Sequence, residues 1–197
     1  AGRELGYAPS EPATAPFDAV LGPAKPVAPT TTPAVPAVEA LKRPPHMHEW
    51  AYVDLPESVR EPKQQKCLAE GIYFESRGES ERGQAAVAQV ILNRVRNPAY
   101  PDTVCGVVYQ NRDWANRCQF SFACDGIPEK VTDSKSWKQA QEIASGVVSG
   151  KEYLPEVGYA THYHATYVRP HWAPRMKKVT KIGLHVFYQF KRGWKFG

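Results

Sequence analysis

The sequence predicts an α+β domain that is mostly helical and carries a short β-sheet. Three stretches within residues 64–150 have apolar residues at helical spacing, and two later stretches alternate as strands do. Helices first and strands later are typical of an α+β domain. Twelve of the 18 prolines lie in residues 1–62, which hold few large apolar residues. We therefore expect a largely disordered proline-rich tail over 1–62 and one folded domain over 63–197.

The first predicted helix covers about residues 64–77 and ends at Gly78. Its apolar residues Leu68 and Ile72 share one stripe with Glu75, at steps of four and three residues. Because Leu68 and Ile72 favour burial, we expect Glu75 at the edge of an apolar face or within it. Burial disfavours a charged carboxylate and raises its pKa, and a carboxyl group that keeps its proton near neutral pH suits general acid catalysis.

The same pattern has a structural interpretation, in which Glu75 is a helix-end carboxylate within an ion pair. The candidate partners for that pair are Arg77, Arg82 and Arg94. Glu79 lies one turn further on and has two alternatives: a second catalytic carboxyl group, or a residue that steadies the loop. Because Gly78 is expected to break the helix, we favour the second alternative.

Two more helices are predicted from capping residues and apolar stripes. The second begins after Ser80, continues through QAAVAQVILNRVRN and ends before Pro98. The third covers SWKQAQEIASGVVSG, with Asp133 or Ser134 as its cap. Between them, the periodicity of the fragment VCGVVYQ fits a short helix or a strand equally well.

Short strands are expected over residues 161–164 and 181–188, which alternate and are rich in aromatic residues. On the first strand, His162 and His164 would share one face and Tyr163 would face the other way. Together with His171 and His185, these two histidines invite a metal interpretation. A lone His-x-His pattern is weak, however, and packed or hydrogen-bonded histidines are the alternative.

Other polar residues are candidates for substrate binding. Asn93 bonds either a sugar or a backbone carbonyl, and its neighbour Arg94 is interpreted as a structural ion-pair partner. The segment of Gln119, Phe120 and Ser121, with a second phenylalanine after it, combines amide, hydroxyl and aromatic groups that suit a carbohydrate cleft. The alternative is that its phenylalanines fill the core. The sequence contains no GxSxG, GxxxxGK[ST] or GxGxxG motif, so serine-hydrolase and nucleotide-binding functions have no motif support.

The sign of the net charge changes at the same boundary as the proline content. Residues 1–62 carry a net charge of −3, and residues 63–197 carry +8. A basic folded domain favours a polyanionic partner such as nucleic acid, anionic lipid or an anionic wall polymer. There is no dense Lys/Arg run and no recognisable nucleic-acid-binding motif, so we expect no nucleic-acid partner. No apolar run has transmembrane length, and no signal peptide is visible.

The four cysteines indicate two disulfides in an oxidising compartment. Cys118 and Cys124 flank a short loop that a bridge closes, and Cys67 would then pair with Cys105. The other two connectivities remain open. Zinc binding with His162 or His164 and four free thiols are further alternatives, although the close-spaced ligand pairs typical of zinc sites are missing.

A resemblance to a known family rests on the run GIYFESRGESERGQAAVAQVILNRVRNPAYPDTVCGVVYQ, and it continues through CQFSFACDG and ATHYHATYVRPHWAPRMKKVTKIGLHVFY. These segments resemble the cell-wall hydrolase family of the spore-cortex-lytic (SleB/CwlJ) type. The resemblance covers about residues 66–190. Its specific signature is ESRGE followed closely by QAAVAQVILNRV.

The resemblance implies a fold similar to that of lytic transglycosylases and the wider lysozyme-like group. It also implies cleavage of the peptidoglycan glycan strand between N-acetylmuramic acid and N-acetylglucosamine. The first Glu of the family's E-x-R-G-E motif corresponds to Glu75, which is therefore expected to be the catalytic acid. No cofactor or metal is expected. The expected substrate-binding residues are Glu79, Asn93, Gln119, Phe120, Ser121, His162, Tyr163 and His164.

The expected reaction is that of a lytic transglycosylase, which leaves a 1,6-anhydromuramic end. Hydrolysis of the same bond, as by a muramidase, is kept open. The rivals are a zinc amidase that cuts the stem peptide and a wall-binding module without activity. We expect a monomer that acts on peptidoglycan in the periplasm or cell envelope, with an envelope tether through the N-terminal segment.

Overall fold

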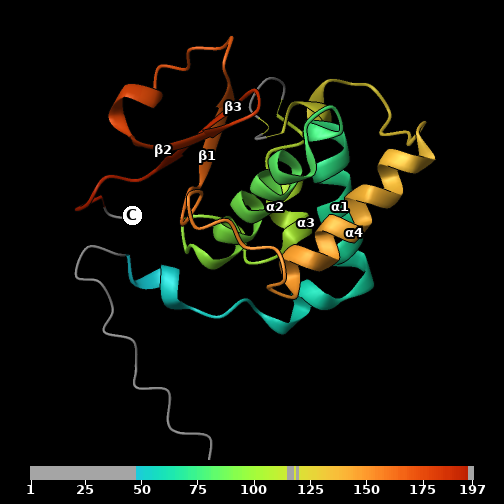
Figure 1. Cartoon of the computed structure of the whole chain (residues 1–197), viewed down its shortest axis with the longest axis horizontal. Coiled ribbons are helices and arrows are strands. Elements are labelled where there is room, and N and C mark those ends of the chain that lie inside the picture. The colour runs from blue at the N-terminus through green and yellow to red at the C-terminus, as the bar shows by residue number, and fades with distance from the viewer. Residues whose placement is uncertain (1–47, 115–117, 119, 195–197) are drawn as a thin grey trace, which may run out of the picture. The chain divides into compact units, whose positions relative to one another are not determined.

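The computed structural model describes residues 48–114, 118 and 120–194 (Figure 1). Residues 1–47 of the tail predicted over 1–62, and the candidate Gln119, lie outside the described residues. The four α-helices are α1 (Pro62–Ser76), α2 (Glu81–Arg96), α3 (Val104–Val108) and α4 (Ser134–Val148). The three strands are β1 (His162–Ala165), β2 (Lys177–Ile182) and β3 (His185–Gln189). Short 3-10 helices cover Glu49–Tyr52, Glu57–Arg60, Ser121–Cys124 and Ala173–Arg175.

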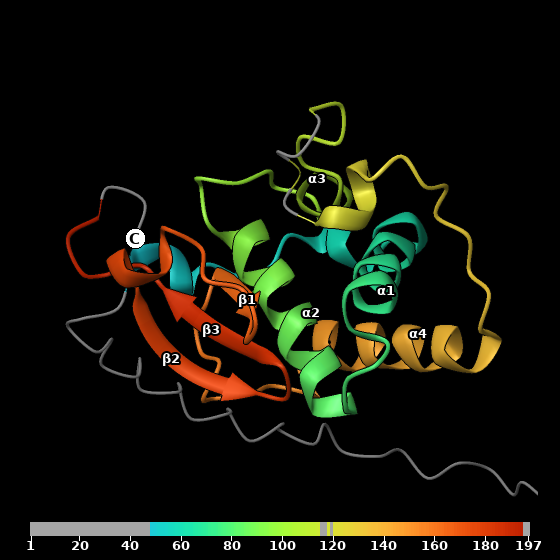
Figure 2. The same cartoon turned by 90° about the horizontal axis from the view of Figure 1, so that it is seen from above.

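This architecture confirms the predicted α+β class, mostly helical with a short sheet. Helix α2 runs between the other helices and the sheet (Figure 2). Its side chains Val87 and Ile91 enter the core shared with α1 and α4, while Ala86 and Val90 pack with Phe187 of β3. A helix that serves two cores is apolar on both sides, which explains why nearly all of α2 is buried.

The helix ends follow the predicted signals. Ser80 caps α2 by accepting a hydrogen bond from the backbone N–H of Gly83. Asp133 caps α4 by accepting from the N–H groups of Lys135 and Ser136. The fragment that the periodicity left undecided is helical, and Thr103 caps it as α3. In the described part of the chain, no helix is long and apolar enough to cross a membrane.

The sheet is antiparallel with the order β1-β3-β2. The predicted single strand over 181–188 is wrong, because the chain reverses within it. Strand β2 ends at Ile182, Gly183 turns with φ of 54°, and β3 begins at His185. Apolar and polar residues alternate on both sides of the turn, so periodicity alone does not reveal where the chain reverses. The lysine-rich beginning of β2 shows too few apolar residues to predict a strand.

The packed part of the chain begins upstream of the predicted boundary at residue 63. Val59 is fully buried in the helical core, and Trp50 is buried and meets Tyr159 edge-on. Two short 3-10 helices carry these side chains. The sequence did not predict these two short helices, because a few apolar residues in a proline-rich stretch give no periodic signal.

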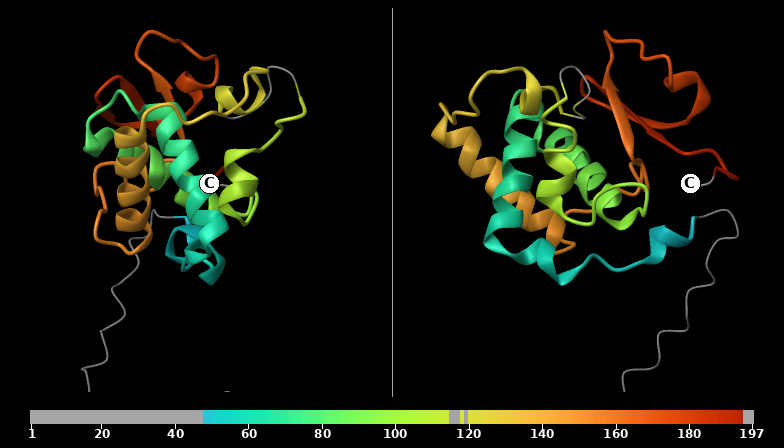
Figure 3. Two further views of the ribbon diagram at one scale, coloured as in Figure 1. Left: turned by 90° about the vertical axis from the view of Figure 1, so that its right-hand side faces the viewer. Right: turned by 180° about the vertical axis from the view of Figure 1, so that it is seen from behind.

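Both disulfides join the cysteines that the sequence paired. Cys67–Cys105 ties α1 to α3, and Cys118–Cys124 closes the loop before α4. The first bridge spans 38 residues and the second spans 6. The 3-10 helix Ser121–Cys124 lies near the end of α1 (Figure 3), and its Phe122 ring stacks on Phe74 in the last turn of α1.

Gly183 generates a stability prediction. A Cβ atom there would lie 1.9 Å from a carboxylate oxygen of Glu79, and the positive φ already disfavours any other residue. We expect Gly183→Ala to lower the free energy of unfolding by about 3 kcal/mol, measured by urea denaturation, since backbone strain adds to the displacement of a buried carboxylate.

Gly150→Ala is the matched control, because Gly150 has φ of 76° and its Cβ would meet nothing within 4 Å. It should cost only about 1 kcal/mol, from backbone strain alone. Equal losses in the two variants would show that the carboxylate contact at Gly183 does not stabilise the hairpin.

Candidate active site

Glu75 stands in the last turn of α1 and faces β1. Its Oε2 accepts a hydrogen bond of 3.0 Å from the hydroxyl of Tyr163. The carboxyl group lines an open cavity of about 420 Å³. Besides these two residues, the cavity lining includes Phe74, Ser121, Tyr167 and His185. An acidic side chain therefore meets solvent at a hollow between the helices and the sheet.

Burial raises the pKa of Glu75 above its ordinary value, because the carboxylate loses most of its hydration. Three interactions oppose that rise: the hydroxyl of Tyr163, the positive charge of Arg94 and the backbone of Ser121. Desolvation outweighs them, so the carboxyl group holds its proton to higher pH than an exposed one. The stripe shared with the fully buried Leu68 and Ile72 is the cause of this desolvation.

The arginines proposed as ion-pair partners of Glu75 are engaged elsewhere. Arg77 donates to the hydroxyl of Tyr73, and Arg82 bonds Glu156. Arg94 is fully buried, and its Nε donates to the carbonyl of Thr161 at 2.7 Å. The structural ion-pair interpretation of Arg94 is wrong, because no carboxylate of the described residues lies at contact distance.

Arg94 is a buried cation held largely by aromatic rings. Its guanidinium carbon lies 5.2 Å from the ring centre of Tyr100 and 5.6 Å from that of Phe120. Within the described part of the chain, Nη1 and Nη2 have no hydrogen-bond partner. Burial lowers the pKa of Arg94, and the nearby Glu75 opposes that shift. The buried charge thus acts on Glu75 through space.

Among the described residues of the disulfide-closed loop, Ser121 lines the cavity and is exposed, and its expected substrate contact stays a prediction. Phe120 is fully buried beneath the cavity and Phe122 belongs to the same core. The expected substrate contact of Phe120 is therefore corrected: its ring fills the core and faces Arg94.

Asn93 is also a scaffold residue. It is fully buried, and its Nδ2 donates to the carbonyls of Gly158 and Ala160, both at 2.9 Å. Of the two roles open to it, the structure places Asn93 on backbone carbonyls, and the expected sugar contact is corrected. With Arg94 on Thr161, it fixes the segment that leads into β1.

Glu79 lies outside α1 and beneath the turn between β2 and β3. Its Oε1 accepts from the N–H of Leu184 at 2.9 Å and lies 3.4 Å from Nδ1 of His185. Only 10% of the side chain is exposed. This arrangement agrees with the loop-steadying role, and it corrects the expected substrate contact because the carboxylate is turned into the hairpin.

The histidines of β1 face away from Glu75, as strand alternation predicts. His162 and His164 both meet the ring of Trp172, whereas Tyr163 points to Glu75. His162 is packed against aromatic rings, and burial lowers its pKa to about 3. Its expected substrate contact is corrected for that reason.

His164 keeps a place in the cavity lining. Its Nδ1 lies 2.8 Å from the carbonyl of Ala165 and its Nε2 lies 3.0 Å from the hydroxyl of Tyr188. Both ring nitrogens therefore already have partners within the protein. Across the described residues, no three His, Cys, Asp or Glu side chains converge as a metal-binding group.

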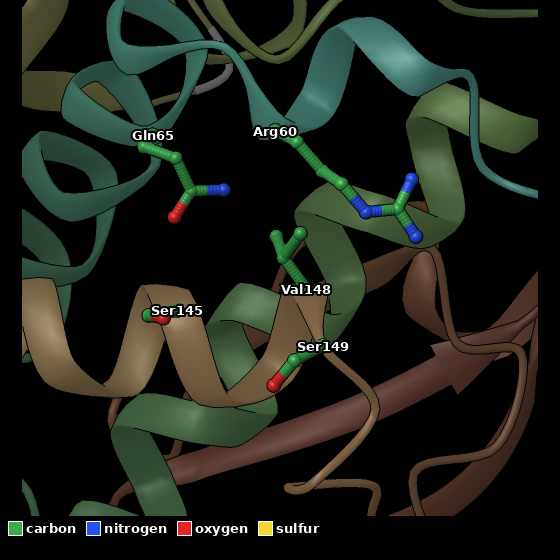
Figure 4. Close-up of a pocket in the computed structure, with 5 residues that line it drawn as sticks. All are labelled: Arg60, Gln65, Ser145, Val148 and Ser149. Carbon is green, nitrogen blue, oxygen red and sulfur yellow. The ribbon is translucent and has the colours of Figure 1, made fainter. Parts of the chain in front are cut away.

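A second hollow, of about 240 Å³, lies between the start of α1 and the end of α4 (Figure 4). Arg60, Gln65, Ser145, Val148 and Ser149 line it. It contains no carboxyl group or histidine, and Gln65 is engaged with the carbonyl of Val59. Of these two hollows, the one at Glu75 therefore has the chemistry of an active site.

His185 and Tyr167 line the Glu75 cavity but were not among the expected site residues: the sequence left Tyr167 open between groove and core, and it offered His185 only as a metal candidate. His185 follows a turn that periodicity could not detect, and its pairing with Glu79 joins segments more than a hundred residues apart. Tyr167 is exposed in the loop after β1. The available signal was an aromatic residue beside a predicted strand. This signal does not distinguish a residue that lines a groove from one that packs in the core.

The fold and site define a class of protein: a mostly helical α+β domain with one desolvated carboxyl group at an open cavity. The family profile described as cell wall hydrolase matches residues 78–188. The chain belongs to the cell wall hydrolase family. The matched segment begins just after α1, so it includes Ser121 and Tyr163 but not Glu75.

The chain is similar to spore cortex-lytic enzymes. It is 30% identical to that of Bacillus cereus over 122 residues, 62% of this chain and 42% of the relative. The relative from Bacillus subtilis is 28% identical over 122 residues, 62% of this chain and 36% of the relative. The chain thus matches less than half the length of these curated relatives.

A solved structure shares the fold. The catalytic domain of the germination-specific lytic transglycosylase SleB from Bacillus anthracis is 30% identical, with a TM-score of 0.53. The match covers 68% of this chain and 99% of that one. The similarity therefore spans a complete catalytic domain of the relative.

The hydrogen bond from Tyr163 generates a prediction for the pKa of Glu75. Because the hydroxyl stabilises the carboxylate, Tyr163→Phe should raise the pKa of Glu75 further, as followed by NMR titration of carbon-labelled glutamate side chains. Tyr100→Phe serves as the control, because Tyr100 lies against Arg94 and does not bond Glu75. An unchanged or lowered pKa of Glu75 in Tyr163→Phe would contradict the assignment.

Proposed function

We propose that this domain cleaves the glycan strand of peptidoglycan between N-acetylmuramic acid and N-acetylglucosamine, with Glu75 as the catalytic acid. The observation that carries the proposal is a carboxyl group whose pKa is raised by burial and which still lines an open cavity. Membership of the cell wall hydrolase family supports the substrate, and so does the similarity to the SleB catalytic domain. The catalytic unit includes residues 48–62, which pack against it.

The reaction begins with transfer of the Glu75 proton to the glycosidic oxygen. The bond to that oxygen breaks, and positive charge develops on the anomeric carbon of the muramic sugar in an oxocarbenium-like transition state. Glu75, now a carboxylate, accepts the proton of the C6 hydroxyl of the same sugar as that oxygen attacks the anomeric carbon. The products are a 1,6-anhydromuramic end and a free hydroxyl on the departing strand, and Glu75 regains its proton.

One carboxyl group suffices for this route, because the nucleophile belongs to the substrate. Among the described residues that line the cavity, Glu75 is the one acidic side chain, and Glu79 is turned into the hairpin. Direct hydrolysis with inversion uses a second carboxylate to activate water. The arrangement therefore favours the transglycosylase route over hydrolysis.

The remaining environment fits an enzyme of the cell envelope. Two disulfides are typical of an oxidising compartment, and peptidoglycan lies outside the cytoplasm. We propose that the segment before residue 48 is a spacer that tethers the domain to the envelope, and that the domain acts as a monomer. Peptidoglycan glycan strands are the partner.

The decisive experiment digests purified peptidoglycan with the wild type and with Glu75→Gln. The amide cannot donate or accept the transferred proton, so release of soluble fragments should fall by about 10²–10⁴-fold. Mass spectrometry of the wild-type digest should show 1,6-anhydromuramic ends. Retained activity in Glu75→Gln would sink the assignment of Glu75.

Glu70→Gln is the matched control, because Glu70 lies on the same helix, is largely buried and bonds the hydroxyl of Tyr109 away from the cavity. Its activity should stay close to that of the wild type. Reducing ends without anhydro sugars would indicate hydrolysis. Release of free stem peptides that stops when a chelator is added would indicate a zinc amidase. Binding to sacculi without release of fragments would indicate a wall-binding module.

A further inference from the structure

The positive charge of the folded part is confined to its C-terminal third. Residues 63–156 contain 12 Lys and Arg and 12 Asp and Glu, so they are neutral overall. Residues 157–197 contain eight Lys and Arg and no acidic residue. The whole net charge of +8 in residues 63–197 therefore belongs to the segment that forms the sheet and its loops. A one-signed surface of this kind attracts anions toward the sheet.

A cavity opens within this basic part and adjoins the site at Glu75. It has a volume of about 390 Å³ and shares His164 and Val168 with the Glu75 cavity. From there it continues beneath the loop after β1, where Thr166, Arg169 and Pro170 line it. The two cavities therefore adjoin at these two residues, with Glu75 lining one and Arg169 lining the other.

Arg169 is an available cation. It is exposed, and it makes no hydrogen bond or ion pair with any described residue. A guanidinium group presents a planar fork of donors that matches a carboxylate in bidentate fashion. Because acidic residues are missing from the whole segment, an incoming carboxylate meets no competing carboxylate of the same segment.

We propose that this second cavity binds the acidic stem peptide of the muramic acid whose glycosidic bond lies at Glu75. The proposal rests on the proposed function. The stem peptide is attached to that sugar through its lactyl group, and it carries free carboxylates. Two adjoining cavities, one lined by the catalytic acid and the other by an unpaired arginine, match the sugar and the peptide of this substrate. The apolar walls at Val168, Ala173 and Pro174 suit the alanyl parts of such a peptide.

A consequence is selectivity for peptide-bearing glycan. A peptide-free strand keeps one lactyl carboxylate on each muramic ring, which the proposal places at Glu75, so it brings no peptide carboxylate to Arg169. The peptide-bearing strand satisfies it, and a hydrogen bond to a charged group stabilises a complex enough to change affinity about tenfold or more. High salt should reduce this preference, because Arg169 is exposed.

The test compares two substrates: peptidoglycan strands with their stem peptides, and the same strands after an amidase has removed the peptides. The wild type should cleave the first with a kcat/KM about tenfold higher. In Arg169→Ala this ratio should approach one, and Arg169→Lys should restore part of it. Lys178→Ala is the control, since Lys178 is an exposed cation of β2 that lines neither cavity, and it should keep the wild-type ratio.

Binding provides the second measurement and does not depend on turnover. With the inactive Glu75→Gln protein, calorimetry should show tighter binding of a disaccharide-peptide than of the peptide-free disaccharide, and Arg169→Ala should remove the difference. Equal cleavage and equal binding of the two substrates by the wild type would overturn the subsite while leaving the proposed function intact. Failure of the wild type to cleave either substrate would overturn the proposed function itself.

Discussion

Desolvation of one carboxyl group is the constraint on which the rest of this structure depends. Glu75 shares a stripe of α1 with Leu68 and Ile72, so packing the helix also buries the acid. A buried carboxylate is costly unless it keeps its proton or gains partners. The hydroxyl of Tyr163 and the charge of Arg94 lower the pKa of Glu75 in part, and no ion pair with a described residue forms. The pKa of the acid is therefore raised, and its carboxyl group still lines the cavity.

Strand β1 lies next to Glu75 because polar side chains of α2 bind the segment that precedes this strand. Gln89 binds the carbonyls of Leu154 and Gly158, and Asn93 and Arg94 bind the carbonyls that follow. These contacts fix the start of β1 and thereby the position of Tyr163. Glu79 ties the far end of the sheet to the turn after α1. Residues that resemble substrate contacts in sequence thus prove to be the frame of the site.

Prediction from sequence succeeded where one local signal decided the structure. The apolar stripe placed Glu75, and capping residues placed the ends of α2 and α4. Prediction failed where contacts between distant segments decide the role of a residue. The sequence does not tell whether the amide of Asn93 binds a sugar or the backbone of a loop 65 residues away. The hairpin at Gly183 was missed because alternation continues through the turn. Arg94 was misassigned because aromatic rings, rather than carboxylates, surround it.

The most direct test of this account is the difference in unfolding free energy between Glu75→Gln and the wild type as a function of pH. Burial raises the pKa of Glu75 above its ordinary value of 4.5, so the wild type loses stability as pH rises through the window between the unfolded and folded pKa values. The amide does not titrate. The account predicts that the stability of Glu75→Gln relative to the wild type increases from pH 4 to pH 8, by an amount that saturates above the folded pKa. A difference that stays constant or shrinks with rising pH would contradict it.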